Sequence, residues 1–124
     1  MKEIVRRFWR YINDASFDKL NEVMNEDASV YLVNTREVFE GREKYIKFNK
    51  RYSGRWYAEL EELYSMEDTV ISIARVFNSL NNASSYVVAI FKFKNGLIQE
   101  SKEYWSENGE APKWRLDEKL SKVY

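Results

Sequence analysis

The sequence predicts an α+β domain in which helices cover one face of a single curved β-sheet. Apolar residues recur at helical spacing in several segments between residues 3 and 52. From residue 55 onward they alternate with polar residues or form short continuous runs, which is typical of strands. Helices followed by a block of strands favour an α+β architecture over an alternating α/β one.

Three helices are expected before residue 53. Residues 3–13 place apolar side chains on one side and charged ones on the other, as an amphipathic helix does. Ser16 suits the cap of a short second helix. Gly41 precedes a third helix over residues 42–52, which Ser53 and Gly54 end. Short extended segments are expected between the second and third helices, at 30–33 and 37–40.

Four long antiparallel strands are expected over residues 55–66, 69–79, 85–94 and 97–106. Asn95-Gly96 is a typical two-residue hairpin turn. Pro112 lies in a tail, about residues 108–124, that we expect outside the sheet. With no repeats or linkers, 124 residues suit one domain spanning 1–124.

The composition excludes several classes of function. Twenty basic and 20 acidic residues leave no excess positive charge for a nucleic acid or an anionic membrane. The chain has no histidine and no cysteine, which excludes Ser-His-Asp and Cys-His catalysis and thiolate or histidine zinc sites. No acidic cluster has the spacing of a calcium loop. We therefore expect no metal and no cofactor.

Two further features bear on location. The longest apolar run, Tyr86–Phe91, is far shorter than the roughly 20 residues of a membrane span. The N-terminus lacks the apolar core of a secretory signal. We expect a cytoplasmic protein without a membrane partner.

A strongly curved sheet covered by helices has a functional consequence. Backbone cannot fill the space near the open end, so a cone-shaped cavity is expected between sheet and helices. Such concave, mostly apolar cavities bind small molecules. We expect a small apolar or carbonyl-containing ligand.

Five segments together resemble the nuclear transport factor 2-like, SnoaL-like family. They are residues 8–12, 25–30, 41–45, 95–98 and 104–107, in that family's order and spacing. A narrower resemblance, which includes residues 34–37 and 54–56, is to a bacterial SnoaL-like subgroup of unassigned function. The resemblance implies a cone-shaped antiparallel or mixed sheet with three N-terminal helices on its concave face.

The ketosteroid isomerases are relatives whose functional positions can be compared one by one. Their oxyanion tyrosine corresponds to Tyr11 and their supporting tyrosine to Asn49. Their base aspartate, however, falls on Leu32, and their protonated aspartate falls on or next to Ala89. Without a base there is no proton shuttle, so ketosteroid isomerisation is rejected.

Two other groups of relatives direct attention to the last strand. The acid/base aspartate of the polyketide cyclases corresponds to Glu103, although the histidine they place nearby is absent. Limonene epoxide hydrolase uses an Asp-Arg-Asp set, half of which Arg75 with Glu103 or Glu62 could imitate, but no matching motif is present.

Glu103 has two alternative roles. Strand alternation puts Ser101, Glu103 and Trp105 on one face. If this face lines the cavity, burial raises the pKa of Glu103 and makes it an acid or base. Otherwise Glu103 pairs across the sheet with Arg75 or Lys92. The expected ligand-binding residues are Trp9, Tyr11, Leu32, Asn49, Trp56, Ala89, Ser101 and Trp105.

Three functions follow from these expectations. The first is binding of a small molecule in an aromatic-lined hydrophobic cavity. The second is an isomerase, cyclase or hydrolase with Glu103 as general acid/base and Tyr11 and Asn49 polarising a carbonyl. The third is a protein-interaction module. Because the long strands are apolar on both faces, we also expect a homodimer through the convex sheet face.

Overall fold

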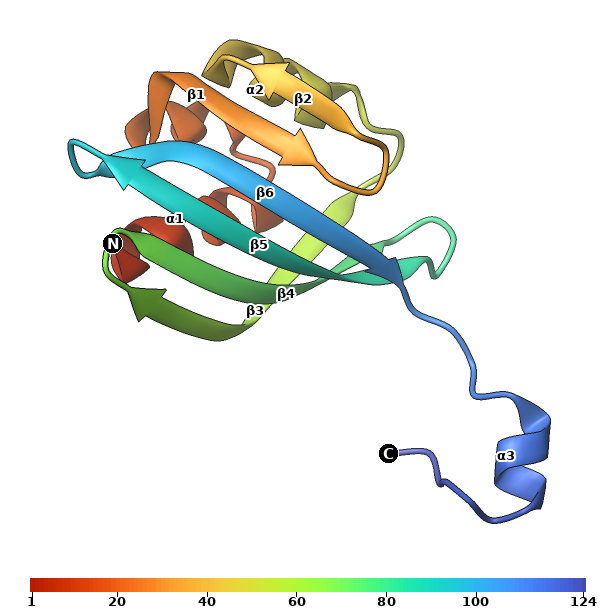
Figure 1. Ribbon diagram of the computed structural model, residues 1–124. Coiled ribbons are helices and arrows are strands. Elements are labelled where there is room, and N and C mark those ends of the chain that lie inside the picture. The colour runs from red at the N-terminus through yellow and green to blue at the C-terminus, as the bar shows by residue number, and fades with distance from the viewer.

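The computed structural model describes residues 1–124 as one α+β fold with a six-stranded sheet (Figure 1). The helices are α1 (Lys2–Asn13), the 3-10 helix η1 (Phe17–Glu22), α2 (Arg42–Arg51) and α3 (Lys113–Asp117). The strands are β1 (Met24–Leu32), β2 (Glu37–Glu40), β3 (Trp56–Met66), β4 (Thr69–Asn78), β5 (Ser84–Lys94) and β6 (Leu97–Glu107).

The sheet is mixed, with strand order β2-β1-β6-β5-β4-β3. Only β1 and β6 are parallel, and every other neighbouring pair is antiparallel. At the β5–β6 hairpin, Asn95 and Gly96 have φ values of 55° and 81°. Positive φ at both central residues is the geometry of the turn that Asn-Gly favours, so the predicted hairpin is confirmed.

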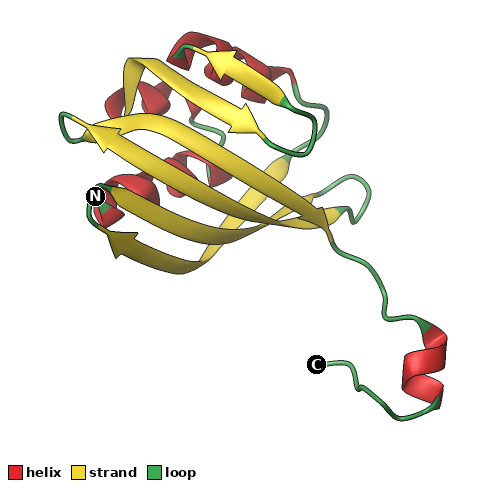
Figure 2. Cartoon of the chain, viewed as in Figure 1, coloured by secondary structure: helices red, strands yellow, loops and turns green.

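The α1, η1 and α2 helices lie on one side of the curved sheet, as the α+β prediction required (Figure 2). The amphipathic α1 buries Val5, Phe8 and Ile12 against it. The Phe8 ring contacts Phe91 of β5, with 5.1 Å between ring centroids. The largest fully buried side chains also include Leu20, Met24 and Ile98. The hydrophobic core therefore lies between the helices and the concave face.

Three local expectations differ from the structure. The second helix is a six-residue 3-10 helix whose Ser16 makes no capping side-chain bond. The strand expected at 30–33 begins at Met24, because the Asn25 amide donates to the Lys94 carbonyl and to Gln99 and so ties this segment to the β5–β6 hairpin. The tail contains the short helix α3, which its sequence did not predict.

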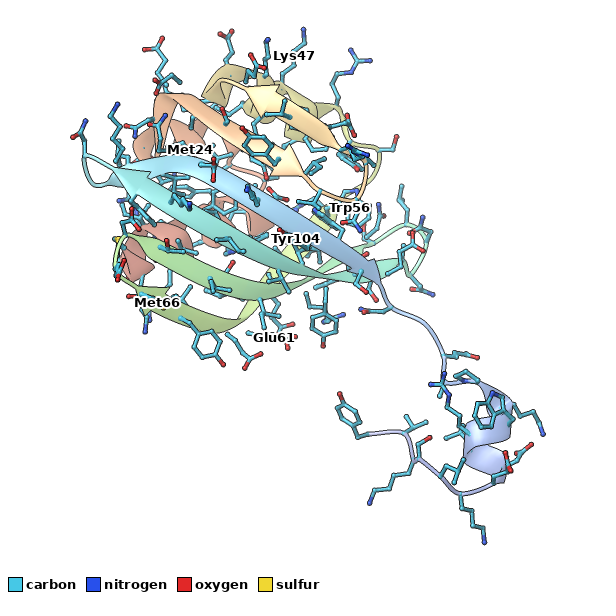
Figure 3. All side chains as sticks on the ribbon, viewed as in Figure 1. Met24, Lys47, Trp56, Glu61, Met66 and Tyr104 are labelled. Atoms are coloured by element: carbon cyan, nitrogen blue, oxygen red, sulfur yellow. The ribbon has the colours of Figure 1, made fainter.

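The convex face of the sheet carries many apolar residues. Ile73 of β4 and Ile90 of β5 are half-buried, and Tyr86 and Tyr104 are exposed. Figure 3 shows Tyr104 on this outer face. After β6 the chain leaves the sheet, and α3 lies away from the body (Figure 1). No helix has the length and hydropathy needed to span a bilayer.

Candidate functional site

A pocket of about 450 Å³ opens between the helices and the concave face of the sheet. Eleven of its 20 lining residues are hydrophobic, so the pocket is mainly apolar. Its aromatic lining residues are Trp9, Phe17, Tyr45, Phe48, Tyr52, Trp56 and Trp105. Its polar lining residues include Asn34, Thr35, Asn49 and Glu103.

Two residues hold α1 against the start of β3 at the rim of the pocket. Asn13, the last residue of α1, accepts a hydrogen bond from the backbone N–H of Ala58 at 3.0 Å. The Arg55 guanidinium donates to the backbone carbonyls of Asn13 and Trp56. It also stacks on Tyr57, 4.2 Å from the ring centroid. These contacts fix the wall that carries Trp56.

Glu103 is the central polar group of the site. Its side chain is on the concave face of β6, between Leu32 of β1 and Ala89 of β5, and the residue is 1% exposed. The Tyr45 hydroxyl of α2 donates to Oε2 at 2.9 Å, and the Trp105 indole N–H donates to Oε1 at 3.1 Å. Each carboxyl oxygen therefore has one neutral donor.

The alternative in which Glu103 forms an ion pair across the sheet is wrong. Arg75 lies on the convex face and pairs with Glu59 at 3.5 Å, while Lys92 is exposed and is paired in register with Glu100. Both basic residues alternate onto the convex face, whereas Glu103 points to the concave one. No salt bridge reaches Glu103.

The environment changes the proton affinity of Glu103 and Tyr45. Burial raises the pKa of Glu103 to about 7, although the hydrogen bonds from Tyr45 and Trp105 act in the opposite direction. Burial, together with the nearby charge of Glu103, raises the pKa of Tyr45 well above its usual value. Tyr45 therefore stays a hydrogen-bond donor near neutral pH while Glu103 can gain or lose a proton.

Asn49 lies one helical turn after Tyr45 on α2 and also lines the pocket. Its side-chain amide donates to the Tyr45 carbonyl at 2.9 Å. This bond orients the amide along the helix, and the side-chain oxygen has no partner among the hydrogen bonds of the structure. Asn49 thus combines a structural bond with a place in the pocket wall.

Six of the residues expected from the sequence line this pocket: Trp9, Leu32, Asn49, Trp56, Glu103 and Trp105. Ala89 and Ser101 do not, because both are fully buried in the sheet beneath it. The Ser101 hydroxyl has no hydrogen-bond partner.

The expectation for Tyr11 is corrected. Its hydroxyl accepts hydrogen bonds from Nε and Nη2 of the Arg7 guanidinium, each at 3.2 Å, and it does not line the pocket. Trp9, two residues earlier, donates to Ser72 of β4 at 2.9 Å. Two residues correspond to about 200° of rotation on a helix, so Tyr11 points away when Trp9 faces the sheet.

Sequence reasoning missed Tyr45, the tyrosine that does contact the carboxyl group. The available signal was the stripe formed on α2 by Tyr45, Phe48 and Asn49 and continued by Tyr52 just after the helix; all four line the pocket. The stripe predicts a buried helix face but not what it faces. That this stripe lies opposite β6 depends on the parallel pairing of β1 with β6.

A curved open sheet with helices and a pocket on its concave side defines the class of cone-shaped α+β proteins. Within this class, the chain belongs to the SnoaL-like domain family, whose sequence profile matches residues 5–101. No curated protein matches the chain in sequence.

Several solved structures share the fold. A ketosteroid isomerase candidate from Kribbella flavida is 21% identical, with a TM-score of 0.84 over 99% of this chain and 88% of its own. An NTF2-like protein of unknown function from Burkholderia xenovorans is 22% identical, with a TM-score of 0.81 over 98% and 94%. A ketosteroid isomerase-like fold from Catenulispora acidiphila, in complex with trimethylamine, is 15% identical, with a TM-score of 0.74 over 84% and 85%.

Proposed function

We propose that the protein binds a small, largely apolar molecule in this pocket and that Glu103 contacts the polar group of that molecule. The observation that carries the proposal is a carboxyl group, 1% exposed, on the wall of an aromatic-lined pocket. A buried carboxyl group costs stability unless another group compensates for its desolvation. A bound ligand that hydrogen-bonds to Glu103 would provide this compensation.

The size and lining of the pocket support a small ligand. About 450 Å³ lies within the range of small-molecule sites, which are mostly apolar with a few placed polar groups. Trp56 and Trp105 offer flat apolar walls, and Asn34, Thr35 and Asn49 offer further hydrogen bonds. The trimethylamine complex of the Catenulispora acidiphila protein is a small-molecule complex of the same fold.

A ligand screen by thermal shift tests the binding proposal. Trp105→Ala removes one wall of the pocket, and Tyr64→Ala, an exposed aromatic residue of β3 outside the pocket, is the matched control. A compound that stabilises the wild type and Tyr64→Ala but not Trp105→Ala supports the proposal. Compounds that stabilise all three proteins equally, or none of them, contradict it.

A second candidate function is acid/base catalysis of the isomerase, cyclase or hydrolase type. It is favoured by the pKa of about 7 at Glu103, because a group that titrates near neutrality can both take and return a proton. Tyr45 and Trp105 would then keep the carboxyl oriented. Ketosteroid isomerisation stays rejected, since its base aspartate corresponds to Leu32 and its protonated aspartate falls on or next to Ala89.

Proton exchange offers a test of catalysis that needs no known substrate. Small ketones in deuterated water would exchange their α-protons faster with the wild type than with Glu103→Gln if Glu103 is a base. Tyr64→Ala should match the wild type. Equal exchange in the wild type and Glu103→Gln contradicts a base role toward carbonyl compounds and leaves the binding proposal standing.

We also propose that two copies of the chain pair through the convex sheet face. The half-buried Ile73 and Ile90 and the exposed Tyr86 and Tyr104 support this proposal, because pairing would remove their apolar surface from water. Light scattering on Ile90→Lys should give a monomer and on Lys47→Ala, far from this face on α2, a dimer. A monomeric wild type at micromolar concentration contradicts the pairing.

A further inference from the structure

We infer that the ligand of the pocket is a cationic amine, whose ammonium group pairs with the Glu103 carboxylate among the aromatic side chains. This inference rests on the proposed binding function and names the ligand's chemical class. The juxtaposition that carries it is a buried acid with neutral donors on both oxygens, aromatic walls, and no base in contact with the acid.

The partners of Glu103 suit an anion. Tyr45 and Trp105 each donate one hydrogen bond to it, and the Trp105 indole N–H cannot accept one. Donors on both oxygens favour the ionised carboxyl group. An ionised group that is 1% exposed and lacks a cation, however, is costly. A positive charge is therefore the component that the site lacks.

The two bases of the pocket do not contact Glu103, whose only hydrogen-bond partners are Tyr45 and Trp105. The pocket lining includes two bases, Lys50 and Arg55, and a second acid, Glu107. Lys50 pairs with Asp18 at 2.7 Å, and Arg55 donates to the Asn13 and Trp56 carbonyls.

The elements packed around Glu103 place no base in contact with it. The strand neighbours of Glu103 are the apolar Leu32 and Ala89. The titratable groups that α2 and the segment after it direct toward the pocket, besides the bases Lys50 and Arg55, are Tyr45 and Tyr52. The second acid, Glu107, adds a further negative charge to the lining.

The aromatic walls favour the same kind of ligand. Trp105 contacts Glu103 directly, and Phe48, Tyr52 and Trp56 form a connected row, with ring centroids 5.0 and 5.7 Å apart along it. The faces of aromatic rings attract cations, and they do so most strongly where water is excluded. A substituted ammonium ion satisfies the carboxylate and places its methyl or methylene groups against these rings.

Choline and its uncharged carbon analogue, 3,3-dimethylbutan-1-ol, separate the charge of the ligand from its shape. We expect choline to bind the full chain at least tenfold more tightly than the alcohol at pH 8, measured by calorimetry. Below the pKa of Glu103, choline affinity should fall about tenfold per pH unit, because protonation removes the anion. Alcohol binding should not fall.

Glu103→Gln should remove both the preference for choline and its pH dependence, while Glu100→Gln on the convex side of the same strand keeps them. If Glu103→Gln does not fold, the pH dependence of choline affinity in the wild type still tests the inference. Equal or tighter binding of the alcohol overturns the amine inference and leaves the pocket proposal standing. Binding of neither probe also overturns the inference, and the thermal-shift screen then decides the pocket proposal separately.

The C-terminal tail supports a second inference, independent of the pocket. We propose that residues 108–124 form an arm that packs against a second copy of the chain. Asn108 is tied to the body through two hydrogen bonds to Ser84, each of 2.9 Å. Beyond Asn108, every hydrogen bond of the arm is made within the arm. Its apolar side chains Trp114 and Leu120 are 57% and 69% exposed.

The arm nevertheless recurs in other proteins of this fold. It comprises 17 of the 124 residues, so superpositions that cover 99% and 98% of the chain include it, whereas one that covers 84% need not. Beyond Asn108 the arm makes no hydrogen bond to its own body. If its position is nevertheless the same in several proteins, another surface must hold it there. Two proteins only 21% and 22% identical to this chain share its fold, so a second copy of that fold would supply such a surface in all three.

The convex sheet face is the surface that the arm fits. It exposes the aromatic Tyr86 and Tyr104 beside apolar residues, and the arm presents Trp114 and Leu120 to such a surface. Packing these side chains together removes apolar area from water on both copies. The inference deepens the proposed homodimer by adding an exchanged arm to it.

Sedimentation velocity over a concentration series tests whether the arm contributes to dimerisation. Truncation after Asn108 keeps the bonds to Ser84, and we expect it to weaken dimerisation at least tenfold. Trp114→Ala should act in the same direction, while Lys122→Ala, also in the arm, should match the wild type. The two point variants keep the test decisive if the truncated chain does not fold.

Two outcomes would overturn the proposal that the arm packs on a second copy. If truncation and Trp114→Ala leave the dimer unchanged, the arm is not part of the interface, and the convex-face dimer stands without it. If the full chain is monomeric, both the arm and the dimer proposal fail. Amide hydrogen exchange should agree: residues 113–117 become more protected as protein concentration rises if the arm packs on a second copy, and not otherwise.

Discussion

The closed and open ends of the concave face differ in how they are filled. At the closed end, Phe8, Phe91 and Ile98 are completely buried, and the two phenylalanine rings contact each other. At the open end, the half-buried Trp56 and Trp105 surround a pocket, and a carboxyl group takes the place of an apolar side chain. The comparison teaches that dense packing at one end can offset the cost of a desolvated acid at the other.

Truncating a side chain at the closed end should have the largest effect. We expect Phe8→Ala to lower the free energy of unfolding by about 4 kcal/mol, because it leaves a cavity in a fully packed core. Trp105→Ala, at the open end, should cost about half as much, because its surroundings are already open to solvent. Urea denaturation of both variants measures the difference. Equal losses would contradict the division into two ends.

The pH dependence of stability should come from the open end. The pKa of Glu103 is raised from 4.5 to about 7 on folding, so the folded state holds this proton more tightly than the unfolded state. This tighter proton binding stabilises the folded state. The stabilisation is fully present below pH 4.5 and is lost as the pH rises through 7, which lowers the free energy of unfolding by about 3 kcal/mol.

The measurement is denaturation of the wild type and Glu103→Gln from pH 4 to 8. The wild type should lose stability relative to Glu103→Gln as the pH rises, and Glu100→Gln should follow the wild type. A constant difference between the wild type and Glu103→Gln across this range would show that Glu103 titrates alike in the folded and unfolded states.

Two glycines with similar backbone angles provide a smaller contrast between the ends. Gly54 beside the pocket has φ of 80°, and a Cβ there would lie 2.8 Å from side-chain atoms of Asn78 and Leu80. Gly96, in the hairpin, has φ of 81° and nothing within 4 Å. Thermal denaturation should give a loss of about 1 kcal/mol for Gly96→Ala, from the left-handed backbone alone. Gly54→Ala should lose more, and equal losses would mean that Asn78 and Leu80 move aside freely.

Removing the hydroxyl of Tyr45 should have the smallest effect. Tyr45→Phe takes away one donor to the carboxylate, so we expect the pKa of Glu103 to rise further and stability near pH 7 to fall by about 0.5 kcal/mol. Titration of the Glu103 carboxyl carbon by NMR measures the pKa, and Tyr11→Phe, whose hydroxyl contacts Arg7, is the control. An unchanged titration in Tyr45→Phe would mean that the bond to Tyr45 does not stabilise the anion.

Predictions that depended on neighbouring residues were the most successful. The Asn95-Gly96 turn requires positive φ at two adjacent positions, and the two residue types alone are enough to predict it. The alternation along β6 likewise put Glu103 and Trp105 on one face, and both line the pocket. The tyrosine expected in the pocket was Tyr11, whereas Tyr45 lies there, because the position of each tyrosine depends on which helix lies over the end of β6.

By itself, the sequence determined the α+β class, the approximate strands and which side chains of the last strand share a face, since local periodicity sets which side chains can share a surface. The tertiary structure alone decided that Glu103 stands between Leu32 and Ala89, opposite Tyr45 and without a basic partner. Those relations join segments 14 to 71 residues apart in the chain. Their distances, and therefore the proton affinity of the site, exist only once the strands have paired and α2 has packed over them.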